Sequence, residues 1–286
     1  MASGRARAAG LLVCLACLVL VARSVQPSSF VEGLRHVRPV WLFPAFLSLG
    51  CFLLLNAVRW SLLLRPLGTF SIPRLLRWQL IGYLGNTVLP LRAGDVGRGL
   101  LAGDESRAGP AAGLATIVVE KTADVAVLVG ALELSILLVG PPRWVGTLAA
   151  FACVLSGGAV LAVVVLAKMR GLRRLLRARP LAGPLRLLEE AAGAVPAPRA
   201  VPPIAAVSVA MWLASALNTW CVLRAAGADV GFAGALLVTA GLNLALAIPS
   251  GPASLGSYEL AVVALLSAMG ISPAPAQLAA LTMRAA

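Results

Sequence analysis

Charged residues are scarce in this sequence, at 12% of 286 residues, whereas 60% are hydrophobic. Soluble domains carry about 25% charged and about 45–50% apolar residues. A chain with so little polar surface cannot cover a globule in water. This composition excludes a cytosolic enzyme, a secreted disulfide-stabilised domain and a disordered tail, and it predicts a polytopic membrane protein.

Residues that commonly hold metals are also few. His36 is the one histidine and lies in a polar stretch. All five cysteines lie inside apolar stretches: Cys14, Cys17, Cys51, Cys153 and Cys221. The first two have the spacing of a redox motif, but they lack the βαβ pattern in which that motif has meaning. We therefore expect no metal site, no cofactor and no disulfide, and we interpret the cysteines as small apolar residues.

Acidic residues are outnumbered, 11 against 24 basic residues, which gives a formal net charge of +13. In a membrane protein, Arg and Lys concentrate in cytoplasmic loops and contact anionic lipid headgroups, so we expect no nucleic-acid partner. Basic residues gather near the N-terminus, at Arg5 and Arg7, and in the stretch 168–199. This distribution predicts that the N-terminus and 168–199 are cytoplasmic.

Apolar stretches suited to membrane helices recur along the chain. About 20 apolar residues cross the ~30 Å hydrocarbon core, and these stretches do not alternate as barrel strands do. They lie at 10–22, 40–64, 112–139, 144–167, 203–223, 232–248 and 257–270. The sequence therefore predicts an all-α polytopic membrane protein, one integral membrane domain over 1–286, with about seven to eight transmembrane segments. A last helix starts at Pro273, and we expect it to be truncated because it reaches only ~21 Å.

Two segments interrupt this pattern with Gly and Pro. The first, 80–101, contains Pro90 and five glycines, and the second spans 248–256. With their flanking residues, both carry Asn, Pro, Gly and an acid in that order: the first from Asn86 to Asp95 and the second from Asn243 to Glu259. One pattern in each half of the chain is compatible with an inverted repeat and points to a transport-type binding site. Because backbone freed by Pro and Gly cannot face lipid, we expect both segments to be re-entrant and to meet. Ordinary loops at these positions are the alternative.

The first interrupted segment also carries charge. Arg92, Asp95 and Arg98 span about two helical turns and can place one carboxylate between two guanidiniums. Such a pair offers forked donors suited to the phosphate diester of a lipid headgroup. The alternative is that both arginines only mark the cytoplasmic side.

Two carboxylates lie near the start of the apolar stretch 112–139. Glu120 and Asp124 are four residues apart and therefore share one face of a helix. Carboxylates at membrane depth normally face a cavity or a basic partner. We expect them to pair with Arg92 or Arg98 and hold the interrupted segment in place; proton or cation coupling is the alternative.

Three motifs together closely resemble the lysylphosphatidylglycerol synthase transmembrane-region family, also called flippase-like domain proteins. They are Asn86-x-x-Leu89-Pro90-x-Arg92-x-Gly94-Asp95-x-x-Arg98, Glu120-Lys121-x-x-Asp124, and Pro249 to Gly256 with Glu259. Asp95 stands where Glu is commoner in the family, and Lys121 where Arg is common. Ala253 and Ser254 replace a more Gly-rich stretch.

The resemblance implies a multi-pass protein of a bacterial inner membrane, related to the membrane domain that moves aminoacylated phospholipid between leaflets. No polar stretch is long enough for the separate aminoacyl-transfer domain, so synthase activity is not implied. We expect a lipid translocase that binds a membrane phospholipid or a lipid-linked substrate. The expected substrate-binding residues are Asn86, Pro90, Arg92, Gly94, Asp95, Arg98, Glu120, Asp124, Pro249, Gly251, Gly256 and Glu259.

The sequence offers no nucleophile beside a base and no cluster of metal ligands, so we expect no enzymatic activity and assign no catalytic residue. The alternative function is an integral-membrane transferase, or an accessory protein, acting on a lipid-linked substrate in envelope biogenesis.

Overall fold

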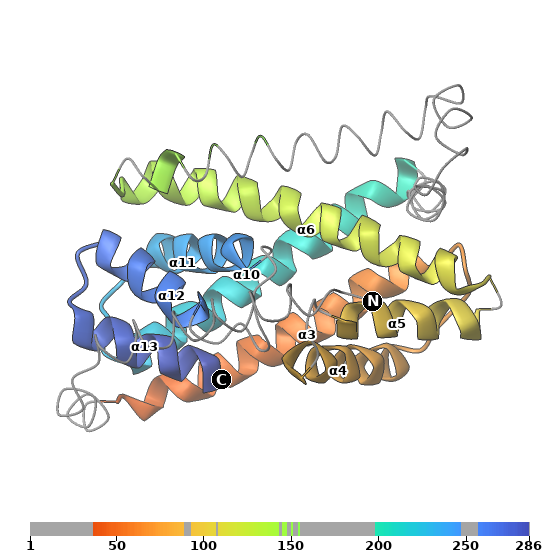
Figure 1. The fold of residues 1–286 in the computed structure, drawn as a ribbon, viewed down its shortest axis with the longest axis horizontal. Coiled ribbons are helices and arrows are strands. Elements are labelled where there is room, and N and C mark those ends of the chain that lie inside the picture. Colours follow the sequence, from red (N-terminus) through yellow and green to blue (C-terminus); the bar gives the residue numbers. More distant parts are fainter. Residues whose placement is uncertain are drawn as a thin grey trace, which may run out of the picture. The chain divides into compact units, whose positions relative to one another are not determined.

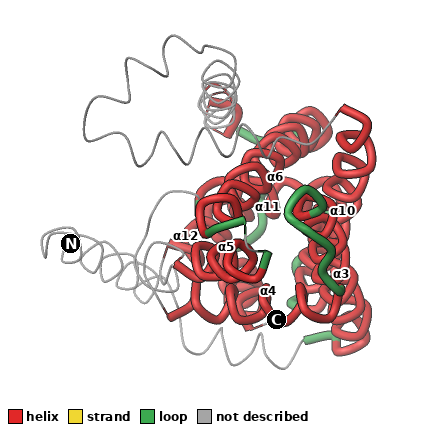
Figure 2. The backbone as a smooth tube through the Cα atoms, turned by 90° about the vertical axis from the view of Figure 1, so that its right-hand side faces the viewer, coloured by secondary structure: helices red, strands yellow, loops and turns green. Residues whose placement is uncertain are grey.

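The computed structural model describes residues 37–88, 93–106, 108–142, 145–147, 150, 154, 198–246 and 257–285. Within these ranges the regular structure is helical, with no strand (Figures 1 and 2). The α-helices are α3 (Leu42–Leu64), α4 (Ile72–Val88), α5 (Ala93–Glu105), α6 (Pro110–Val139), α10 (Val201–Ala225), α11 (Phe232–Ala245), α12 (Ser257–Ala268) and α13 (Pro273–Ala285). The short 3-10 helices Pro39–Trp41 and Pro198–Ala200 precede α3 and α10.

Three described stretches are long and apolar enough to cross a membrane: Pro39–Leu64, Pro110–Val139 and Val201–Ala225. Two shorter apolar helices follow the last of them, at Phe232–Ala245 and Tyr258–Ala268. The prediction of an all-α polytopic membrane protein is thereby confirmed. The spans predicted at 10–22 and 144–167 fall outside the described residues, apart from a few positions of the second.

The chain divides into two compact units. We call 53–127 with 151–211 the α4–α5 unit, and 1–52, 128–150 and 212–286 together the α11–α13 unit. Helices α3, α6 and α10 each contribute one part to each unit, because their boundaries fall inside these helices.

The core of the α4–α5 unit joins five helices through apolar contacts. Its buried side chains are Ala57, Trp60, Leu63, Leu64, Leu75, Ala102, Ile117 and Ile204. Aromatic rings extend this core: the Trp60 and Trp78 rings meet edge to face at 6.0 Å, and Phe70 lies 5.6 Å from Trp78. This core fixes α3, α4, α5 and α6 around the polar residues described below.

Helices α4 and α5 lie side by side (Figure 1) because glycines face each other where they meet. A Cβ on Gly85 would lie 2.9 Å from the Cα of Gly94, and a Cβ on Gly94 would lie 2.7 Å from the backbone N of Asn86. Small residues let helix backbones approach closely. Glycines 82, 85, 94, 97 and 99 lie inside the two helices, so the expectation that they interrupt the segment was wrong. The only part of 80–101 outside these helices is 89–92, which is not described.

The contact between α5 and α6 uses glycines in the same way. A Cβ on Gly99 would lie 2.9 Å from the Ile117 side chain, and a Cβ on Gly113 would lie 2.5 Å from the backbone N of Gly103. Helix α5 therefore has a close backbone contact on each side. This placement holds the charged side chains of α5 in a fixed position against α6.

The α11–α13 unit is built from neighbouring short helices. Helix α12 packs against both α11 and α13. Its apolar core includes Leu237 on α11, Leu266 on α12 and Ala279 on α13 among the fully buried residues. Trp220 anchors the start of α11, because its indole N–H donates to the carbonyl of Val230 at 3.0 Å.

A short sequence pattern occurs once in each unit, and each pair of matching positions is separated by the same number of residues. Leu64-Arg65-x-x-Gly68 ends α3, and Leu223-Arg224-x-x-Gly227 ends α10. Both glycines have positive φ, at +149° and +78°, where a residue with a Cβ is strained. The same separation relates Gly82 to Gly241 and Pro90 to Pro249. These positions are compatible with an internal repeat, although Asn86 and Asn243 are out of this register.

Candidate functional site

Six charged residues of the α4–α5 unit form one connected group, which we call the ion-pair network. It comprises Arg59 on α3, Asp95 and Arg98 on α5, and Glu120, Lys121 and Asp124 on α6. All of them except Lys121 are buried. The network therefore links three helices through charges that are removed from solvent.

Arg98 and Glu120 form its central pair. The Arg98 Nη2 and Nη1 atoms donate to the two Glu120 carboxylate oxygens at 2.6 and 3.2 Å, and Arg98 Nε donates to Asp95 Oδ1 at 3.1 Å. The Arg98 guanidinium also lies 4.9 Å from the centre of the Trp60 ring. Forked pairing and stacking on an aromatic ring are the contacts for which arginine is better suited than lysine.

Arg59 joins the network from the apolar helix α3. Its Nη1 donates to Asp124 Oδ1, and its Nη2 lies 3.4 Å from Glu120 Oε1. The same Nη2 donates to the side-chain oxygen of Asn56 at 3.1 Å. Two carboxylates and one amide therefore hold this guanidinium, whose side chain has no exposed area.

Helix α4 contributes polar neutral groups beside these charges. The Asn56 amide donates to the Tyr83 hydroxyl at 2.6 Å, and the Asn86 side-chain oxygen accepts from the backbone N–H of Asp95 at 3.2 Å. The second bond caps the first turn of α5 from α4. Gln79, one turn before Tyr83, is buried, and neither polar atom of its amide has a hydrogen-bond partner among the described residues.

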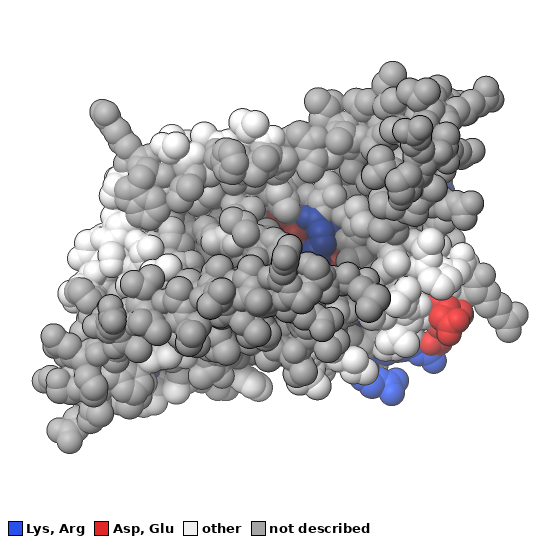
Figure 3. Space-filling view, in the orientation of Figure 1, with Lys and Arg blue, Asp and Glu red and all other residues white. Residues whose placement is uncertain are grey.

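Lys121 is more exposed than the two arginines, and its ammonium lies farther from the carboxylates around it. Its ammonium lies 3.5 Å from Asp95 Oδ2, 3.7 Å from Glu120 Oε1 and 3.8 Å from Asp124 Oδ2, and its side chain is 40% exposed. No contact falls within the usual 2.7–2.9 Å of a charge-assisted hydrogen bond. Figure 3 shows that basic and acidic side chains lie together at the surface in this view. Lys121 is thus the accessible and loosely held cation of the network.

The network is balanced, with three cations and three carboxylates. Burying two arginines is costly unless each finds partners of opposite charge, and here each does. Both guanidiniums are therefore already engaged by protein carboxylates. Among the described residues of this site, Lys121 is the basic side chain that an anionic ligand could reach.

The structure brings together most of the site residues predicted in the first half of the chain. Those that lie in or beside the network are Asn86, Gly94, Asp95, Arg98, Glu120 and Asp124. Pro90, Arg92, Pro249, Gly251 and Gly256 lie outside the described residues. Glu259 is buried in the first turn of α12, in the α11–α13 unit, so the expected meeting of the two interrupted segments stays a prediction.

Sequence reasoning did not assign four members to this site: Asn56, Arg59, Tyr83 and Lys121, the last of which was noted only within the motif Glu120-Lys121-x-x-Asp124. The available signal was an arginine inside an apolar stretch, with an asparagine three residues earlier. An ionisable residue within a membrane helix normally faces a protein partner rather than lipid. Among the described residues, no group of three or more His, Cys, Asp or Glu could hold a metal ion.

Helices of membrane-spanning length that meet at a buried network of ion pairs define the chain as a polytopic membrane protein with a polar interior site. The chain matches the family model described as lysylphosphatidylglycerol synthase TM region over residues 7–286, and it belongs to that family. This family places it in a lipid-related membrane context. Comparison with curated proteins and with solved structures finds no match.

Proposed function

We propose that the chain is a lipid translocase that binds the anionic phosphate of a lipid headgroup at Lys121. The observation that carries this proposal is the position of the Lys121 ammonium, which is 40% exposed and no closer than 3.5 Å to any carboxylate of the network. A phosphate oxygen that approaches it can form a shorter bond than these carboxylates do. The ligand is a membrane phospholipid or a lipid-linked substrate.

The buried part of the network supports this role by holding its shape. Arg59 and Arg98 tie α3, α5 and α6 to one another, so the carboxylates around Lys121 stay in place when its ammonium turns toward a ligand. Rigid surroundings reduce the entropic cost of binding. The Gln79 amide, which has no hydrogen-bond partner among the described residues, adds one more donor and one more acceptor on the face of α4 that carries Tyr83.

The test is a leaflet-exchange assay in liposomes with fluorescent phosphatidylglycerol. We expect Lys121→Gln to slow the exchange by about tenfold, because a hydrogen bond to a charged group contributes about 1.5–3 kcal/mol. Lys121→Arg keeps the charge and should retain most of the rate. Arg77→Gln, which removes an exposed cation on α4, is the matched control.

An unchanged rate in folded Lys121→Gln protein would contradict the proposal. A radiolabelled headgroup-transfer assay on the same liposomes separates translocation from the transferase alternative. We propose that the protein is not an enzyme, and we therefore expect leaflet exchange without transfer of label. Label appearing on a second lipid would favour the transferase.

We further propose that the protein lies in a bacterial inner membrane with a cytoplasmic N-terminus. The excess of Arg and Lys in 168–199 supports this orientation. A reporter that is active only in the periplasm, fused after Arg177, is expected to be inactive, whereas a cytoplasmic reporter at the same position is expected to be active. The opposite pattern would overturn this orientation.

A further inference from the structure

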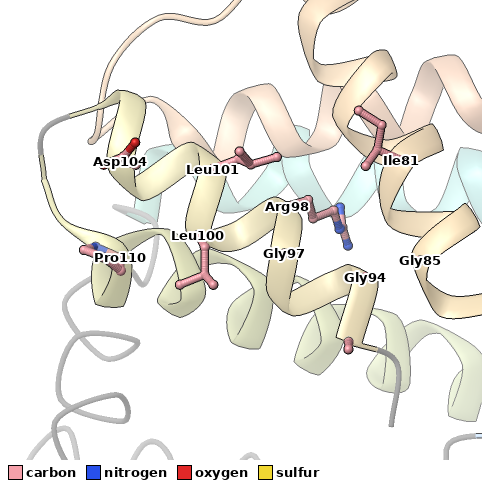
Figure 4. Close-up of a pocket in the computed structure, with 10 residues that line it drawn as sticks. Ile81, Gly85, Gly94, Gly97, Arg98, Leu100, Leu101, Asp104 and Pro110 are labelled. Atoms are coloured by element: carbon pink, nitrogen blue, oxygen red, sulfur yellow. The ribbon is translucent and has the colours of Figure 1, made fainter. Parts of the chain in front are cut away.

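A groove with a volume of about 600 Å³ lies between α4 and α5, beside the ion-pair network (Figure 4). Ligand sites in proteins commonly enclose about 300–1,000 Å³. Leu101 of α5 and Ile81 of α4 both point into the space between the helices, and Arg98 points toward Gly85 in the same space. The groove is therefore large enough for a ligand, and its walls are mostly apolar.

The lining residues of α5 follow one face of that helix. Gly94, Gly97 and Leu101 recur at intervals of three and four residues, and Asp104 continues the same face. From Gly94 to Asp104 this face extends about 15 Å along the helix. Among the lining residues, only Arg98 and Asp104 are charged.

Gly97 keeps this groove open. A Cβ added to Gly97 would meet no atom within 4 Å, whereas a Cβ on Gly94 or Gly99 would lie within 3 Å of a neighbour. Glycine in a helix interior is unfavourable relative to alanine, and at Gly97 no close backbone contact offsets that cost. The missing side chain leaves room above the helix backbone for a ligand.

Arg98 connects this groove to the ion-pair network. The same side chain lines the groove and donates to Asp95, and Asp95 in turn is the carboxylate nearest to Lys121. Arg98 is thus a side chain common to the groove and to the network that surrounds Lys121. A polar ligand or an extended peptide would find few hydrogen-bond partners on these walls.

We propose that the groove binds a hydrocarbon chain of the same lipid whose headgroup meets Lys121. This inference rests on the proposed function for the identity of the lipid. It assigns substrate recognition to two separate contacts: a charged contact at Lys121 and an apolar contact over Gly97. Exposed Leu101, at 43%, forms part of the apolar contact.

The test uses the full chain in phosphatidylethanolamine vesicles with a trace of phosphatidylglycerol that carries a diazirine in its acyl chain. After irradiation, mass spectrometry of the peptides measures where the label attaches. We expect the label on α5 between residues 97 and 104. Gly97→Leu should reduce this labelling about tenfold, because its side chain displaces several methylene groups of the ligand.

Gly130→Leu is the control, because Gly130 is likewise a glycine inside a helix whose Cβ would meet nothing within 4 Å. It should leave the labelling of α5 unchanged. Leu101→Asn, at an exposed position, should lower the labelling without affecting the helix contacts, so the test does not depend on one variant. Thermal melting of each variant checks that it is folded.

The outcomes separate this inference from the proposed function. Equal labelling of α5 in the wild type, Gly97→Leu and Leu101→Asn proteins would show that the groove does not bind the hydrocarbon chain. Attachment of the label only outside α5 would show the same. If Lys121→Gln moves lipid at the normal rate while Gly97→Leu still loses the label, the headgroup proposal fails and the groove is supported. Crosslinks from a photoactivatable amino acid introduced at position 101 to a second copy of the chain, with none to lipid, would overturn a lipid occupant.

Discussion

Replacing Glu120 by Gln is expected to lower the free energy of unfolding by about 3–5 kcal/mol, the cost of breaking a buried ion pair. Glu120 accepts both hydrogen bonds of the Arg98 fork and also lies 3.4 Å from Arg59 Nη2. A neutral amide in its place leaves the two buried guanidiniums and the partly exposed Lys121 ammonium facing two carboxylates. Denaturation of the purified protein with SDS, monitored by circular dichroism, measures the change.

Glu133→Gln provides the control on the same helix. Glu133 is an exposed residue of α6, and surface substitutions of this kind usually change stability by no more than about 0.5 kcal/mol. Equal stability of the two variants would show that the ion-pair network does not stabilise the fold. A folded but weakened Glu120→Gln protein with normal lipid exchange would assign Glu120 to stability alone.

Replacing Gly94 by Ala is expected to destabilise the protein by about 3 kcal/mol or more, because the added methyl group overfills a closed contact. Its Cβ would collide with the backbone oxygen of Gly82 and would lie 2.7 Å from the backbone N of Asn86. Backbone atoms cannot move aside as a flexible side chain can. Helices α4 and α5 must then separate, which also pulls Asp95 away from the Asn86 cap.

Gly97→Ala, three residues along the same helix, is expected to stabilise the protein instead. Its Cβ has open space, and replacing glycine by alanine inside a helix stabilises it by about 0.5–1 kcal/mol. Thermal unfolding of both variants beside the wild type measures the difference. A Gly94→Ala protein as stable as Gly97→Ala would contradict the close contact between α4 and α5.

Much of the fold could be predicted from composition and spacing. The apolar stretches at 40–64, 112–139 and 203–223 correspond to α3, α6 and α10 within two or three residues at each end. A shared helix face for Glu120 and Asp124 follows from their four-residue spacing alone. These features depend on neighbours along the chain, which a single sequence shows directly.

The glycines of the first interrupted segment show where local reasoning fails. Glycine weakens an isolated helix, so Gly82 and Gly94 suggest a break when each is considered alone. In the folded chain they lie opposite each other, and the backbone contact they permit outweighs that local cost. Helix propensity is a property of one segment, whereas this backbone contact forms only when two helices pack together.

The sequence by itself determined that the protein is helical and spans a membrane, and that rare charges accompany the first interrupted segment. Only the tertiary structure decided how those charges pair. Arg59 and Asp124 are 65 residues apart, and their contact exists because α3 and α6 present these side chains to each other. The same packing buries both arginines and leaves Lys121 exposed. Partner choice and exposure depend on where helices lie in space, and the spacing of residues along one helix carries no information about that.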